Sequence, residues 1–101
     1  MKLPKLVRDM IPSIIEKDGK KCSYRKAKKD EVSHFLYRKI EEEVLEFIEK
    51  PSAEEAADIY EVFLCMLRNH GIDFSSVVNH AYHKRVERGS FERHFILEAV
   101  D

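Results

Sequence analysis

The chain has 101 residues, of which 44% are hydrophobic and 37% are charged, a balance typical of one folded domain rather than a disordered segment. Its formal net charge of -1 argues against bulk nucleic-acid binding, and no apolar stretch approaches the roughly 20 residues of a membrane span. The first residues lack an apolar signal core, and the isolated Cys22 and Cys65 fit a reduced chain, so we expect a cytoplasmic protein.

The first third of the chain predicts an extended arm, a short helix and a connecting segment. Residues 1–9 are expected to form a basic arm, and Pro12 suits the first turn of a helix that Gly19 ends. The weak alternation of residues 22–27 is compatible with a short strand. Asp30 is a suitable N-cap for the helix that follows.

The rest of the chain predicts three long helices, because apolar residues recur there at spacings of three and four. The pattern Ser52-x-x-Glu55 is a capping box that opens the second of them. The fold class is therefore all-α, an antiparallel helical bundle in a single domain of residues 1–101. The three helices are expected between Asp30 and Pro51, Ser52 and Gly71, and Asp73 and Gly89.

The second long helix is apolar around almost its whole circumference, from Ala56 to Leu67. Such a helix is normally buried on all sides, and a domain of this size cannot easily bury it alone. We therefore expect a homo-oligomer, a dimer or larger, that forms through this helix.

Acidic residues gather on both sides of Pro51, in the two helices that it separates. In an antiparallel hairpin, residues equidistant from the turn lie at the same height, and two acidic pairs satisfy that condition. Crowded carboxylates repel one another, and a hard divalent cation such as Mg²⁺ relieves the repulsion. The two pairs are Glu43 with Asp58 and Glu46 with Glu55.

A plainer interpretation of these acids remains open. Acidic runs on helices are commonly solvated surface, with i,i+4 partners such as Arg38 or Lys39. Glu55 also has a structural role of its own in the capping box.

Basic residues supply a complementary set of candidate ligands. Lys84 and Arg88 are spaced i,i+4 on the third long helix, and Lys5 and Arg8 lie in the arm. Their charges suit phosphate oxygens.

Three blocks of the sequence resemble one family. Glu42-Glu43-x-x-Glu46 with Glu55-x-x-Asp58 resembles the EExxE…ExxD signature of the all-α nucleoside triphosphate pyrophosphohydrolases, which include MazG, the dimeric dUTPases and phosphoribosyl-ATP pyrophosphohydrolase. Residues 5–12, KLVRDMIP, resemble the KLVRDKIP start of a small MazG-like branch, often labelled phosphoribosyl-ATP pyrophosphohydrolase-like. Residues 84–91, KRVERGSF, resemble its K-x-x-x-RGGF ending, with Ser90 in place of a glycine.

This resemblance implies an oligomeric helical bundle that cleaves a nucleoside triphosphate between its α- and β-phosphates, with Mg²⁺ or Mn²⁺ as cofactor. A damaged or non-standard nucleotide is the expected substrate. The alternatives are a non-catalytic sensor or partner subunit that binds metal and nucleotide, and phosphoribosyl-ATP hydrolysis in histidine biosynthesis. The resemblance makes Glu43, Glu46, Glu55 and Asp58 metal ligands, Glu42 and Glu43 catalytic carboxylates, and Lys84, Arg88 and Arg8 phosphate contacts.

Overall fold

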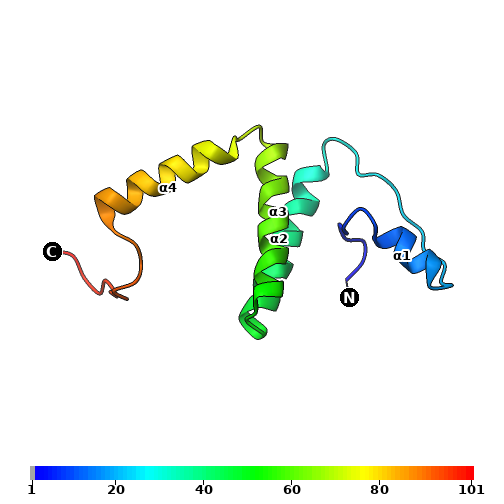
Figure 1. Cartoon of the computed structure of the whole chain (residues 1–101), viewed down its shortest axis with the longest axis horizontal. Coiled ribbons are helices and arrows are strands. Elements are labelled where there is room, and N and C mark those ends of the chain that lie inside the picture. Colours follow the sequence, from blue (N-terminus) through cyan, green and yellow to red (C-terminus); the bar gives the residue numbers. More distant parts are fainter. Residues whose placement is uncertain (1) are drawn as a thin grey trace. The chain divides into compact units, whose positions relative to one another are not determined.

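The computed structural model describes residues 2–101, which form four α-helices and no β-strand (Figure 1). The expected all-α class is therefore confirmed. The helices are α1 (Ile11–Lys17), α2 (Val32–Glu49), α3 (Ala53–Asn69) and α4 (Phe74–Arg88).

The short strand considered for residues 22–27 was wrong, because this segment is irregular. A strand needs a partner for its backbone hydrogen bonds, and no other described segment is a strand. Asp30 was also wrong as an N-cap, because α2 begins after Glu31 and no side chain caps it. The Glu31 carboxylate instead accepts hydrogen bonds from Arg25 and from the backbone N–H of Lys28.

The chain divides into two compact units, the first ending at Gly71 and the second beginning at Ile72, and each is described here by itself. The expectation of one domain stays a prediction. None of the helices within residues 2–101 combines the length and the apolarity needed to cross a membrane.

The first unit is organised by the hairpin of α2 and α3, which pack against each other side by side. The chain turns between them at Lys50, Pro51 and Ser52, and the Ser52 hydroxyl accepts a hydrogen bond of 3.1 Å from the backbone N–H of Glu55. The predicted serine cap is therefore confirmed. Leu36 and Leu67 are the apolar side chains that the hairpin buries, and Leu36 is only 1% exposed.

An irregular segment of the first unit, residues 2–10, precedes α1 and is called the arm below. The arm lies against the hairpin, because Lys5 contacts α2 and Arg8 contacts α3 through their side chains. Arm and hairpin together carry every side chain of the candidate site.

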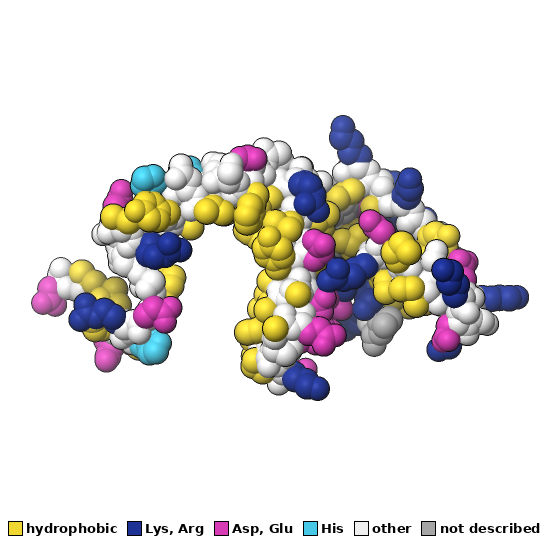
Figure 2. Space-filling model, in the orientation of Figure 1, with side chains coloured by type: hydrophobic (Ala, Val, Ile, Leu, Met, Phe, Trp, Pro, Cys, Tyr) yellow, Lys and Arg dark blue, Asp and Glu magenta, His cyan; other side chains and the backbone are white. Residues whose placement is uncertain are grey.

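The second unit consists of α4 and the tail that follows it. Gly89 ends α4 with a φ of 83°, a left-handed conformation that glycine adopts without strain. No residue of this unit is buried, and Val78, Tyr82 and Val86, spaced i,i+4 along α4, are all more than half exposed (Figure 2). An amphipathic helix with an uncovered apolar stripe normally packs against something else.

Candidate metal centre

Five carboxylates of the hairpin form two overlapping triads. Within each triad, one oxygen from every member lies within 4.8 Å of the others. Of the two pairs predicted from the spacing about Pro51, Glu43 and Asp58 share a triad, whereas Glu46 and Glu55 do not. Glu43 is the residue common to both groups. The triads are Glu42, Glu43 and Glu46 on α2, and Glu43 of α2 with Glu55 and Asp58 of α3.

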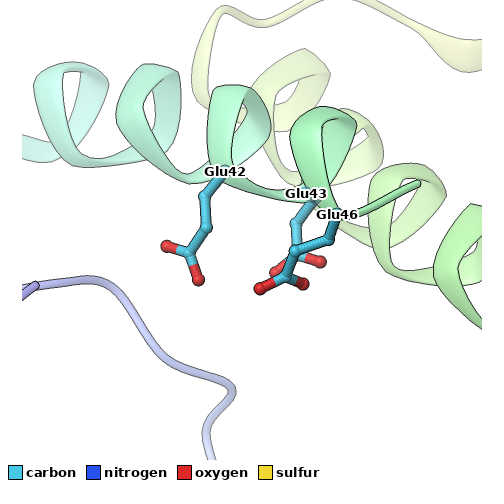
Figure 3. A group of neighbouring side chains, drawn as sticks. All are labelled: Glu42, Glu43 and Glu46. Carbon is cyan, nitrogen blue, oxygen red and sulfur yellow. The ribbon is translucent and has the colours of Figure 1, made fainter. Parts of the chain in front are cut away.

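The three carboxylates of the α2 triad project from the same side of the helix (Figure 3). Glu42 and Glu46 are i,i+4 and Glu43 and Glu46 are i,i+3, the two spacings that place side chains on one helical face. The negative charge of Glu43, with smaller contributions from burial and from Glu55, raises the pKa of Glu46.

Glu43 is buried, with its side chain only 7% exposed. One of its oxygens, Oε1, lies 3.1 Å from Nζ of Lys39 and forms an ion pair with it. The other, Oε2, is buried and has no hydrogen-bond partner among residues 2–101, and the same holds for Oε2 of Glu55. A buried carboxylate oxygen without a partner is costly, so these two atoms are open to a further hydrogen-bond donor or cation.

Lys39 neutralises part of the α2 triad from within the helix. Its ammonium lies 3.4 Å from Glu42 and 3.1 Å from Glu43, and its side chain is only 14% exposed. Burial disfavours the charged ammonium, but the hydrogen bonds and charges of the two glutamates outweigh it, so the pKa of Lys39 is raised. The plainer interpretation therefore identified the right partner, although Glu43 is not a solvated residue.

The arm brings two further cations to the acids. Lys5 Nζ lies 3.2 Å from Glu42 Oε1, and Arg8 donates a hydrogen bond of 2.7 Å to Asp58 Oδ1. Burial of Glu42 opposes its ionisation, but Lys5 and Lys39 together prevail and lower its pKa. Arg8 pairs with Asp58 within the chain, and its predicted contact with phosphate stays a prediction.

A groove of about 370 Å³ runs between the arm and α2 beside the α2 triad. Its lining combines apolar side chains, such as Leu6 and Phe35, with both cations and carboxylates, including Lys5 and Glu46. The first unit thus offers space for a small polar ligand next to its acidic residues.

The remaining predicted phosphate contacts, Lys84 and Arg88, lie on α4 in the second unit. Both are exposed, and both belong to the last two turns of that helix. Their role at the acidic site stays a prediction.

Lys39 and Lys5 are the site residues whose importance the sequence did not reveal. Lys39 was considered only as a partner of surface acids, and Lys5 only as a general phosphate contact. Lys39 could have been identified, because it precedes Glu43 by four positions on one helical face. No local pattern could have paired Lys5 with Glu42, because 37 positions separate them.

Carboxylate oxygens are the ligands that Mg²⁺ and Mn²⁺ prefer, and soft or imidazole ligands are absent from both triads. The donor set thus fits a hard divalent cation. The chain matches no family model, no curated protein and no solved structure in the comparisons made.

Proposed function

We propose that this chain is a Mg²⁺-dependent nucleoside triphosphate pyrophosphohydrolase of the MazG-like class. It would add water across the phosphoanhydride bond between the α- and β-phosphates and release a monophosphate and pyrophosphate. The observation that carries the proposal is the buried Glu43, shared by two carboxylate triads and left with a partnerless oxygen. The resemblance of three sequence blocks to this class supplies the reaction.

Four residues would hold the metal, two from each helix of the hairpin: Glu43, Glu46, Glu55 and Asp58. When bound, Mg²⁺ supplies positive charge that orients a polyphosphate and offsets the charge of the leaving group. Glu42 lies at the edge of this set, where it would orient the attacking water and accept its proton. Glu43 would assist it as the second carboxylate of the EE pair.

Basic residues would hold the phosphates. Arg8 already lies at the site, 2.7 Å from Asp58, and its planar guanidinium suits a phosphate as well as a carboxylate. Lys84 and Arg88 are assigned the same role from their spacing and their motif.

We also propose that the chain works as a homo-oligomer through α3. Ile59, Phe63 and Met66 of α3 are only partly buried within one copy. The uncovered stripe of α4 adds to the apolar surface that a second copy would cover. Burial of that surface stabilises association in proportion to its area.

One observation favours a second candidate, a non-catalytic module that binds metal and nucleotide. Glu42, the candidate proton acceptor, is paired with both Lys5 and Lys39, which lower its pKa. A carboxylate with a lowered pKa is a weaker base. The two candidates share the metal site and differ in turnover.

A screen of nucleoside triphosphates with and without Mg²⁺, scored for pyrophosphate release, separates them. The enzyme releases pyrophosphate only with the metal, and Glu43→Gln abolishes the release. Glu54→Gln is the matched control, because Glu54 is an exposed acid of the same hairpin that lies outside both triads and outside the lining of the groove. Nucleotide binding without pyrophosphate release across the screen would identify the module instead.

A further inference from the structure

Three cations contact three of the five triad carboxylates, namely Glu42, Glu43 and Asp58, and these cations differ in how firmly the fold holds them. Lys39 belongs to α2, so its backbone is fixed relative to Glu42 and Glu43. Lys5 and Arg8 belong to the arm, whose residues 2–10 form no helix or strand. Release of the two arm cations would therefore break no helical hydrogen bond, whereas displacement of the Lys39 backbone would break those of α2.

The two contacts of the arm differ in their exposure to water, because the Lys5 side chain is only 20% exposed whereas that of Arg8 is open to solvent. The side chains of Arg8 and Asp58 are 54% and 33% exposed, and ion pairs this accessible to water contribute little stability. Arg8 nevertheless takes an oxygen of Asp58, a member of the triad that also contains the partnerless oxygens of Glu43 and Glu55. Lys5 takes an oxygen of Glu42 in the other triad.

The charges at the site show why a divalent cation and the arm would oppose each other. When all are ionised, the five carboxylates carry five negative charges, and the three positive charges that pair with Glu42, Glu43 and Asp58 leave a net charge of two negative. A divalent cation would balance the remainder, but it would then lie beside the guanidinium of Arg8. Two like-charged groups a few ångströms apart repel each other, so each weakens the binding of the other.

We propose that the arm is an internal competitor for the metal site, in which Arg8 and Lys5 act as counter-ions that a divalent cation displaces. This inference rests on the metal site of the proposed function and adds its regulation. Metal binding and arm release are then two sides of one equilibrium, and each favours the other to the same extent. The displaced Arg8 guanidinium becomes free to bind an anion such as a phosphate.

The test is a calorimetric titration of Mg²⁺ into the full chain and into two variants. Arg8→Gln removes the competing charge, so it binds Mg²⁺ about three- to tenfold more tightly than the parent. Arg25→Gln is the matched control, since it removes the same charge from another exposed ion pair, with Glu31. Glu31 precedes Glu42 by eleven positions, about 16 Å along a helix, beyond the Debye length of about 8 Å at physiological salt.

Limited trypsin digestion supplies the second measurement. The bonds after Lys5 and Arg8 should be cut several times faster when Mg²⁺ is added to the parent chain, as followed by mass spectrometry. Cleavage after Arg25 should not change, and this bond serves as the internal reference.

The possible results distinguish failure of the proposed competition from failure of the proposed metal site. If the parent binds Mg²⁺ and Arg8→Gln binds it no more tightly than Arg25→Gln, the competition is refuted and the metal site stands. If neither the parent nor Arg8→Gln binds Mg²⁺, the metal site itself is refuted and the competition with it. Binding by Arg8→Gln alone would show that the arm excludes the metal completely.

Discussion

Lys39 and Glu43 form an ion pair of 3.1 Å one helical turn apart on α2, and this pair satisfies only one of the two carboxylate oxygens of Glu43. The lysine lets a buried glutamate remain charged, and the free oxygen leaves it available to a further cation. Glu43 therefore takes part in a structural ion pair with Lys39 through one oxygen and remains a candidate metal ligand through the other.

Replacing Lys39 with methionine should destabilise the chain by about 1–3 kcal/mol, because the buried charge of Glu43 loses its partner. Urea unfolding measures the loss, and Lys39→Arg, which keeps the charge, should recover most of it. Mg²⁺ should stabilise Lys39→Met more than it stabilises the parent, since the metal supplies the missing positive charge. Equal stabilisation of both chains by Mg²⁺ would contradict the shared role of Glu43.

Glu46→Gln should raise the melting temperature of the metal-free chain and weaken Mg²⁺ binding. The raised pKa of Glu46 shows that its charge is disfavoured beside Glu43, so neutralising it relieves repulsion. The gain in stability should shrink as the pH falls and the parent residue becomes protonated. Calorimetric melting measures both effects, with Glu41→Gln as control because Glu41 is an exposed acid of α2 outside both triads. A lower melting temperature for Glu46→Gln would refute the repulsion.

Glu31 should titrate with a pKa of about 2, well below its usual value, because Arg25 and the backbone N–H of Lys28 stabilise its charged form. A carboxyl with a lowered pKa stabilises the fold above its unfolded pKa, and the contribution disappears as the pH falls toward 2. NMR titration of the side-chain carboxyl measures this value. In Arg25→Gln the pKa should rise toward the ordinary range of glutamate; an unchanged value would show that Arg25 does not form the pair in solution.

Leu36→Ala should destabilise the hairpin by about 2–5 kcal/mol, the usual cost of emptying a buried leucine site. Leu3→Ala is the matched control, because Leu3 is 72% exposed, and it should change the free energy of unfolding by less than about 0.5 kcal/mol. Urea unfolding of both variants is the measurement. Similar losses in the two would place the core elsewhere.

Phe63→Glu should dissociate the proposed oligomer or cause aggregation, because a charge buried in an apolar interface costs several kcal/mol. Arg68→Glu, a charge change at an exposed position of the same helix, should leave the assembly intact. Sedimentation at micromolar concentration distinguishes the two. A parent chain that sediments as a monomer would refute the oligomer.

The sequence predicted the hairpin well because its determinants are local. Pro51 and Ser52 fix the turn, and the spacing of acids about that turn brings Glu43 and Asp58 together. The ends of the helices near Gly19, Gly71 and Gly89 were also predictable, since each glycine has a positive φ.

The parts that could not be predicted depend on contacts between distant segments. Nothing near Arg8 in the sequence indicates Asp58, which lies 50 positions later. The burial of individual acids was also not predictable. Glu43 is buried while Glu46 is exposed, because the position of α3 decides which of these glutamates is covered.

Calorimetric titration of Mg²⁺ into the parent and into Glu43→Gln tests the central claim most directly, because Glu43 belongs to both carboxylate triads. The parent should bind the metal, and Glu43→Gln should bind at least about tenfold more weakly while keeping its helical circular dichroism. Glu54→Gln should bind like the parent. If Glu43→Gln and the parent bind Mg²⁺ equally, or if neither the parent nor Arg8→Gln binds it, the acids of the hairpin are not a metal site.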